Sequence, residues 1–271
     1  MRSTEKDWGM ILESMATGQA LPKSDGPNGS FGEDSLLRLF SPLCPGESGW
    51  VIGQLGQSLD GRIATATGAS RYINGDDGLS HLHRLRAVCD AVVVGAGTAI
   101  EDDPRLTVRH VSGRQPVRVV VDRRDRLPRE YHLLADGEAP TLHLVAGQIM
   151  PAESSVVPRN GITRIPCLDA AAETIDPDRV LAVLRRFGLR RVFVEGGGRT
   201  VSAFLKGGWL DRLHVMVAPM IIGSGYPAFT LPEVDRLRDA IWPRAQVVNL
   251  GSDVLFDLDL RQCGESHRAQ E

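Results

Sequence analysis

The residues whose types and spacing could do chemistry lie in the segment 191–207. A short apolar and β-branched run, typical of a buried strand, ends on the acid Glu195. Three consecutive glycines follow it and leave the turn free of side chains: Gly196, Gly197 and Gly198. Helical spacing begins at Arg199. The first N–H groups of a helix have no internal partner and lie at its positive end, so this turn could bind an anion. Arg199 and Thr200 would add a cation and a hydroxyl donor.

Two interpretations of this glycine turn stay open on the residues alone. In the first, it binds a phosphate or a dinucleotide at the carboxyl end of a strand, where open α/β sheets bind ligands. In the second, the glycines serve only tight packing between strand and helix. The dinucleotide fingerprint G-x-G-x-x-G is incomplete because Val201 occupies the third glycine position, and Lys206 lies too far along for a P-loop.

A second strand–glycine–helix unit is expected at 91–98, where Gly95 follows a run of valines. The acid pair Asp102–Asp103 beyond it could bind a metal, but adjacent acids before a proline are more often turn residues, so we expect no metal. Arg86, on a helix expected at 76–88, is most simply a solvent-exposed charge. The sequence has no nucleophile elbow and no zinc-deaminase pattern. The pattern therefore favours binding of phosphates on two molecules, with the chemistry carried by a cofactor.

The composition is that of a globular protein without a nucleic-acid partner. The 271 residues are 42% hydrophobic and 24% charged, and the net charge of −3 lacks the basic excess typical of nucleic-acid binding. No secretory signal and no apolar run of ~18 residues is found, so we expect a cytoplasmic protein that does not enter a membrane. The four cysteines are isolated and are expected to be buried or inert thiols: Cys44, Cys89, Cys167 and Cys263.

Strands and helices alternate through the middle of the chain. Strands are expected at 50–56, 91–94, 116–122, 141–145, 162–165, 191–195 and 212–218, and helices at 76–88, 177–187 and 199–205. Two further strands around Gly251 should form an antiparallel hairpin. The pattern predicts an α/β fold with a mixed, mostly parallel sheet flanked by helices. We expect an N-terminal extension at 1–49, with a short helix and a segment at 35–40 that docks on the core or on a partner. One catalytic domain at 50–262 and a tail at 263–271 would follow.

Four ordered motifs resemble a single family. They are S-L-D-G-R-I-A at 58–64, G-A-G-T at 95–98 followed by D-D-P-R-L-T-V-R at 102–109, V-E-G-G at 194–197, and A-P with I-G-S within 218–224. They are similar to the C-terminal reductase domain of the bifunctional deaminase/reductase of riboflavin biosynthesis, whose fold is related to dihydrofolate reductase. The resemblance covers about residues 51–260. No counterpart of the deaminase half is expected in these 271 residues.

The resemblance implies an NADPH-dependent reductase. Its substrate would be a phosphoribosylamino-pyrimidine, 5-amino-6-(5-phosphoribosylamino)uracil, whose ribosyl group becomes ribityl when C1′ of the opened, imine-like sugar takes a hydride. Residues at the family's cofactor-binding positions are Gly56, Tyr72, Thr98, Asp102, Gly197, Gly198, Arg199, Thr200, Val201, Ser202 and Ala203. Residues at the substrate-facing positions are Ser70, Arg86, Leu106, Arg109 and Glu195. The arginines would suit the 5′-phosphate, and Glu195 is the candidate catalytic residue, although catalysis should rest mainly on positioning.

Two positions depart from the family pattern. Gln54 stands where many members carry lysine, and Tyr72 stands where tryptophan is common. The lost cation leaves alternatives open, namely another pyrimidine, a pterin or a dihydrofolate-like substrate. A non-catalytic nucleotide-binding protein is the alternative from a different class, and the retained Asp102, Arg109 and Glu195 favour the enzyme over it. The resemblance also implies a homodimer.

Overall fold

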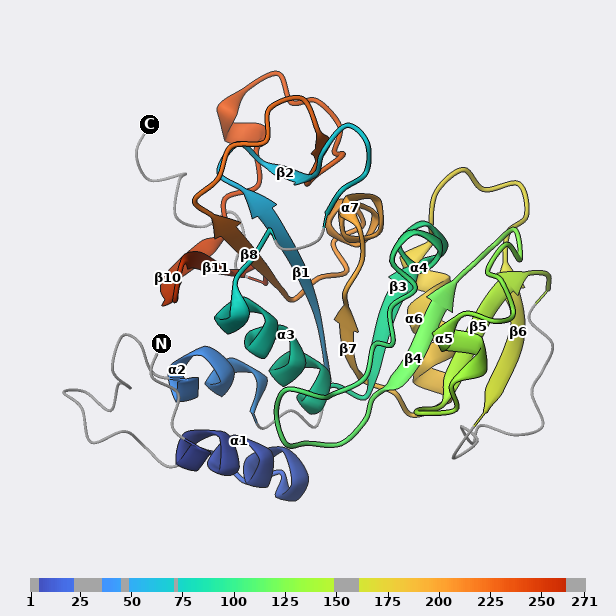
Figure 1. Cartoon of the computed structure of the whole chain (residues 1–271), viewed down its shortest axis with the longest axis horizontal. Coiled ribbons are helices and arrows are strands. Elements are labelled where there is room, and N and C mark those ends of the chain that lie inside the picture. Colours follow the sequence, from blue (N-terminus) through green and yellow to red (C-terminus); the bar gives the residue numbers. More distant parts are fainter. Residues whose placement is uncertain (1–4, 22–35, 45–48, 71–72, 149–160, 262–271) are drawn as a thin grey trace.

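The chain folds around one nine-stranded sheet with helices on both faces (Figure 1). The computed structural model describes residues 5–21, 36–44, 49–70, 73–148 and 161–261, and all structural statements concern these residues. A two-stranded ribbon, β2 (Arg62–Ala64) with β9 (Tyr226–Pro227), lies beside the carboxyl end of β1.

The order of the strands in the sheet is β10-β11-β8-β1-β7-β3-β4-β5-β6. Neighbours from β8 to β6 are all parallel, whereas β11 is antiparallel to both β8 and β10. This arrangement confirms the predicted mostly parallel sheet with a C-terminal antiparallel hairpin. The strands are β1 Trp50–Ser58, β3 Ala91–Gly95, β4 Val117–Val121, β5 Thr141–Ala146, β6 Ile162–Leu168, β7 Arg191–Val194, β8 Arg212–Ala218, β10 Arg244–Leu250 and β11 Asp253–Asp259.

Helices cover both faces because the central strands carry β-branched apolar residues on both sides. Every residue of β3 is buried. The helices are α1 Glu5–Thr17, α2 Leu36–Phe40, α3 Asp76–Val88, α4 Ala96–Asp102, α5 His132–Ala135, α6 Pro177–Arg186 and α7 Gly198–Lys206, with 3₁₀ turns η2 Ser41–Leu43 and η3 Leu237–Asp239. Apolar side chains of α1 to α5 share a core with one face of the sheet, and those of α6 and α7 share a core with the other. Asp176 caps α6 as its sequence predicts, since its carboxylate accepts the N–H of Asp178.

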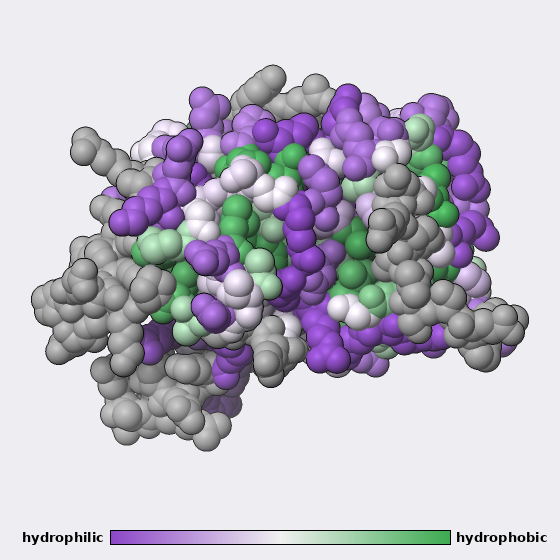
Figure 2. Space-filling view, turned by 90° about the horizontal axis from the view of Figure 1, so that it is seen from below, coloured by the Kyte–Doolittle hydropathy of each residue, from purple (hydrophilic) through white to green (hydrophobic). Residues whose placement is uncertain are grey.

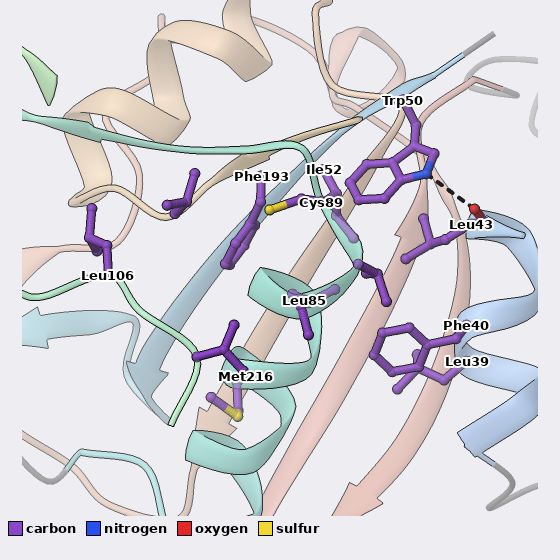
Figure 3. Packing of buried hydrophobic residues seen from close by; sticks show 14 of the residues in the cluster. Leu39, Phe40, Leu43, Trp50, Ile52, Leu85, Cys89, Leu106, Phe193 and Met216 are labelled. Carbon is purple, nitrogen blue, oxygen red and sulfur yellow. Dashed lines mark hydrogen bonds between the residues drawn. The ribbon is translucent and has the colours of Figure 1, made fainter. Parts of the chain in front are cut away.

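The two N-terminal helices belong to the first of these cores. Phe40 and Leu39 of α2 lie against α3, and the indole of Trp50 donates a hydrogen bond of 3.2 Å to the carbonyl of Leu43 (Figure 3). The indole of Trp8 on α1 donates one of 2.9 Å to the carbonyl of Ser112. The segment expected to dock on the core or on a partner therefore docks on the core. The three-segment division of the chain stays a prediction.

Exposed apolar side chains concentrate toward the C-terminal end of the chain. Most large apolar residues that are more than a third exposed fall between 220 and 256, among them Ile221, Leu237, Trp242 and Val247. The face seen from below shows hydrophobic areas set among hydrophilic residues (Figure 2). No helix in the described ranges has the length and apolar character needed to cross a bilayer.

Candidate active site

A cavity of about 860 Å³ opens at the carboxyl ends of the parallel strands. Its wall includes Gln54 and Gly56 of β1, Gly95 at the end of β3 and Glu195 directly after β7. This is the edge of an α/β sheet at which ligands bind, and the volume lies in the upper part of the range for small-molecule sites.

The order of the strands gives the cavity two different ends. Next to β1 and α3 the wall carries the apolar side chains Leu79, Leu82 and Met216, and this part is called the apolar end; the polar Gln54 and Asn74 also line it. Next to β4 the wall carries three arginines that follow that strand, and this part is called the cationic end: Arg123, Arg124 and Arg126. Three acids that follow β6 line the cavity beyond them: Asp169, Glu173 and Asp176. Strands β7 and β3 lie between these ends, so Glu195 and the glycine turns line the middle.

Glu195 is held by Arg86, which lies in the last turn of α3. The Arg86 Nε and Nη2 atoms donate to the two carboxylate oxygens of Glu195 at 2.7 and 2.5 Å, and Nη1 donates to the carbonyl of Thr107 at 3.0 Å. Arg86 is only 5% exposed, so it is not the solvent-exposed charge that its sequence context suggested. A planar guanidinium that donates hydrogen bonds to both oxygens holds the carboxylate in one orientation.

The glycine turns serve both packing and the cavity. The Gly197 N–H donates to the hydroxyl of Thr98 at 2.9 Å, which ties the two turns together. A Cβ on Gly198 would run into the carbonyl of Ala228, so this glycine is required by packing. A Cβ on Gly97 would meet nothing within 4 Å, although Gly97 lines the cavity, so its backbone is open to a ligand. Helix α7 has no side-chain cap at Gly197, which leaves its N-terminal dipole facing the cavity.

The cationic end was not recognised in the sequence. Arg123 is half-buried, and its Nη1 atom is buried without a hydrogen-bond partner in the described part of the chain. Arg124 and Arg126 are exposed at the same rim. The available signal was the run of arginines directly after a central parallel strand, where side chains reach the ligand-binding edge.

The structure brings most of the predicted site residues together. Those that line the cavity are Gly56, Ser70, Thr98, Asp102, Glu195, Gly197, Gly198, Arg199 and Thr200. Those that do not form its wall are Arg86, Leu106, Arg109, Val201, Ser202 and Ala203. Val201 and Ser202 are buried, and the hydroxyl of Ser202 accepts the N–H of Thr230 at 2.8 Å. Tyr72 lies outside the described residues.

Arg109 belongs to a loop that lies behind Glu195. Its Nη1 atom donates to the hydroxyl of Thr107 at 2.8 Å, and its backbone N–H donates to Nδ1 of the buried His83 at 3.0 Å. Leu106 is buried in this loop with a positive φ of 55°, an uncommon conformation for leucine. Burial and then the neighbouring charge of Arg86 lower the pKa of Arg109. The loop therefore brings the guanidinium group of Arg109 close to that of Arg86, near Glu195.

The acid pair at the end of α4 divides between two tasks. Asp103 accepts the backbone N–H of His132 at 2.8 Å and lies 2.7 Å from its Nδ1 atom, so it anchors α5. Asp102 lines the cavity, where its Oδ1 atom lies 3.5 Å from the hydroxyl of Ser70. Within the described ranges, the side chains grouped closely enough to hold a metal are elsewhere: Asp122, Asp125 and His143.

The S-L-D-G motif is joined by hydrogen bonds to the loop after β8. Asp60 accepts the hydroxyl proton of Ser58 at 2.6 Å and the backbone N–H groups of Ile222 and Gly223 at 3.1 and 2.7 Å. These hydrogen bonds, the one from Ser58 first, lower the pKa of Asp60 to about 2. The S-L-D-G motif and the I-G-S motif, far apart in the sequence, are thus two hydrogen-bonded loops that lie side by side.

Comparison with known proteins agrees with this architecture. A sequence model of the RibD C-terminal domain matches residues 49–256. The chain is 37% identical over 219 residues to the 2,5-diamino-6-ribosylamino-4(3H)-pyrimidinone 5′-phosphate reductase of Methanothermobacter thermautotrophicus, covering 78% of this chain and 98% of the relative.

Two longer proteins match over part of their length. The chain is 33% identical over 212 residues to the riboflavin biosynthesis protein RibD of Aquifex aeolicus, covering 78% of this chain but only 57% of that protein. The structure of Acinetobacter baumannii RibD superimposes with a TM-score of 0.65 at 26% identity and covers 85% of this chain and 62% of that one. The match of the family model, together with the similarity over nearly all of the archaeal reductase, shows that the chain belongs to the RibD C-terminal domain family.

Proposed function

We propose that this chain is an NADPH-dependent reductase that converts the ribosyl group of a phosphoribosylamino-pyrimidine into a ribityl group in riboflavin biosynthesis. The observation that carries the proposal is one continuous cavity with an apolar end, a cationic end and Glu195 between them. Such a cavity can hold two molecules with their reacting atoms side by side. Membership of the RibD C-terminal domain family supports the reaction class.

The residues at the cationic end fit the dinucleotide. The open backbone at Gly97 and the uncapped N-terminus of α7 would receive its pyrophosphate. Arg123, Arg124 and Arg126 together would suit a further phosphate, which distinguishes NADPH from NADH. When bound, the cofactor supplies a hydride.

The apolar end would hold the pyrimidine ring, with Leu82 and Met216 against it. Glu195 would accept hydrogen bonds from N–H and O–H groups of the substrate, because Arg86 fixes its carboxylate in the middle of the cavity. Arg109 lies outside the cavity wall, and its exposed side chain would meet the 5′-phosphate only where the sugar phosphate extends past Glu195. Charge-assisted hydrogen bonds there would contribute roughly 1.5–3 kcal/mol each. In the reduction, C1′ of the opened sugar gains the hydride and the adjacent nitrogen gains a proton.

The test is NADPH oxidation in the presence of the phosphoribosylamino-pyrimidine, followed by absorbance. We expect turnover with NADPH and at least tenfold lower kcat/KM with NADH. Arg123→Gln should remove most of that preference, whereas Arg129→Gln should keep it, because exposed Arg129 follows the same strand but does not line the cavity. Binding of NADPH without turnover would contradict the substrate assignment, and dihydrofolate and pterins would then be tested as acceptors.

The assembly and location proposed with this function are a homodimer in the cytoplasm. The exposed apolar side chains between 220 and 256 support the dimer, since residues such as Trp242 and Val247 would be covered by a second copy. Sedimentation equilibrium at micromolar concentration should give twice the 29.4 kDa mass of the chain. A single species of the monomer mass would contradict it.

A further inference from the structure

The two N-terminal helices pack against α3, the helix that carries Arg86. The match to the family begins at residue 49, so α1 and α2 lie outside it. They lie beside α3 and share a core with it, in which Trp8 is only 6% exposed and Phe40 is fully buried (Figure 1). Phe40 packs edge-on against both Trp8 and His81 of α3, with ring centroids 5.7 Å apart in each pair. A segment that only leads into a domain does not need such burial.

Trp8 of α1 contacts two elements that are separate in the sequence. They are α3 and the loop 103–116, which connects α4 to β4. The indole N–H of Trp8 donates a hydrogen bond of 2.9 Å to the carbonyl of Ser112 in the loop. The guanidinium carbon of Arg84 on α3 lies over the indole ring, 6.0 Å from its centroid, a distance at which a cation and an aromatic ring attract each other. Trp8 therefore joins the loop to the helix.

The backbone of the loop lies directly against both helices at Gly113. A Cβ added to Gly113 would lie 2.5 Å from the Cβ of Ala87 on α3 and 3.8 Å from a methyl carbon of Leu12 on α1. Packing this close leaves the loop no room to move toward α3, and α1 covers it from the other side. The three elements are therefore positioned as one unit.

The same helix and loop hold Glu195. Arg86 of α3 donates to both carboxylate oxygens of Glu195 and, through its Nη1 atom, to the carbonyl of Thr107 in the loop. A second link joins the backbone N–H of Arg109 in the loop to Nδ1 of His83 on α3. The position of the Glu195 carboxylate therefore depends on the spacing between α3 and the loop.

We propose that Trp8 is a positioning residue for Glu195, and that α1 holds α3 and the loop 103–116 at the spacing that the active site requires. Trp8 does not form part of the cavity wall. It meets α3 at Arg84, and residues two apart on a helix do not face the same side, so Trp8 and Glu195 contact different sides of α3. Trp8 therefore acts through α3 and the loop, without touching the substrate. This inference rests on the proposed function, in which Glu195 orients the substrate.

The test is a thermodynamic cycle that combines Trp8→Leu with Glu195→Gln in the full chain. Calorimetry measures the affinity for the phosphorylated ribitylamino-pyrimidine product, which requires no turnover, and steady-state kinetics measure kcat/KM. Trp8→Leu alone should lower both by about tenfold, because a displaced carboxylate no longer meets the ligand. In the Glu195→Gln background it should cost less than about twofold, since a carboxamide has one oxygen and cannot accept from both Arg86 donors.

The affinity for NADPH separates this role from a general loss of structure. The cofactor is proposed to bind at Gly97 and at the N-terminus of α7, so its Kd should change by less than about twofold in Trp8→Leu. The cycle is repeated with Trp8→Phe, which keeps a ring against Arg84 and loses only the N–H that Ser112 accepts. This milder change should give the same pattern with a smaller factor.

The matched control is Trp50→Leu. Trp50 is also 6% exposed, and its indole also donates to a backbone carbonyl, that of Leu43. It joins the N-terminal segment to β1, however, and not to the loop 103–116. Trp50→Leu should lower the melting temperature about as much as Trp8→Leu does, but it should leave the product affinity within about twofold of wild type.

Three results would overturn the inference while the reductase assignment stands. They are unchanged product affinity in Trp8→Leu and Trp8→Phe, equal losses in the wild-type and Glu195→Gln backgrounds, and the same loss of affinity in Trp50→Leu as in Trp8→Leu. A wild-type protein that binds neither the ribitylamino-pyrimidine product nor NADPH would overturn the reductase assignment and the inference with it.

Discussion

At the residue scale, the site depends on a charge pair whose members are 109 positions apart in the sequence. Arg86 is almost fully buried and Glu195 is 18% exposed, so neither charge is well solvated without the other. Sequence patterns do not reveal such a pair. Helical periodicity assigns Arg86 to the same helix as Leu85 and Val88, but it does not show which other part of the chain packs against the end of that helix. The position of Glu195 at the cavity could be predicted from its place at the end of a strand, but Arg86 as the group that holds it could not.

Arg86→Gln should therefore impair both folding and catalysis. We expect the free energy of unfolding to fall by about 3 kcal/mol, since breaking a buried ion pair leaves one charge uncompensated. The double variant with Glu195→Gln should lose little further kcat/KM beyond Glu195→Gln alone, because both side chains act through the same carboxylate. Urea unfolding and steady-state kinetics measure the two effects.

Arg105→Gln provides the matched control for this pair. Arg105 pairs with Glu138 from the loop behind Glu195, but both side chains are more than a third exposed. Its loss should cost less than about 1 kcal/mol. Independent, additive losses of activity in Arg86→Gln and Glu195→Gln would argue against a positioning role for Arg86.

At the element scale, the strands and helices that build the site follow from local patterns. The helix at 76–88 and the strand at 212–218 have the bounds that periodicity predicts, because each is a continuous apolar pattern bounded by turn residues. The cationic rim was missed for a different reason. Arg123 acquires its role only from the position of β4 in the sheet, and the strand order is a long-range property that a single segment does not encode.

The glycine turns give a prediction at this scale, because two glycines of the same cavity have opposite surroundings. Gly198→Ala should lower the melting temperature by several degrees, since the added Cβ meets the backbone carbonyl of Ala228. Gly97→Ala should keep or raise it, because alanine favours the helix and the Cβ meets no protein atom within 4 Å.

The two variants should also differ in their affinity for NADPH, and here Gly97→Ala should be the impaired variant. The methyl group of Gly97→Ala would project into the cavity, so the Kd for NADPH should rise at least tenfold in a protein that is fully folded. Thermal melting and fluorescence titration with NADPH measure the two properties. Unchanged NADPH affinity in Gly97→Ala would exclude the cofactor from the neighbourhood of α4.

At the scale of the whole molecule, the core beneath α3 joins the site to the rest of the fold. His83 of α3 lies fully buried in this region and accepts the Arg109 N–H. Burial, followed by the positive charges of Arg86, His110 and Arg109, lowers its pKa from the ordinary 6.5 to about 3. The same residues that support the loop behind Glu195 therefore make folding sensitive to acid.

The sign of this dependence follows from proton linkage. Below pH 6.5 His83 is protonated in the unfolded chain, whereas in the folded chain it stays neutral until about pH 3. Its contribution to the free energy of unfolding is therefore complete above pH 6.5 and is lost as the pH falls toward 3. Between pH 7.5 and pH 5.0 this one group should cost about 2 kcal/mol of unfolding free energy. His83→Gln, which can still accept the Arg109 N–H, should reduce the loss by that amount, while exposed His110→Gln should retain most of it. Urea unfolding at the two pH values measures the difference, and equal losses in wild type and His83→Gln would show that His83 does not resist protonation in the folded protein.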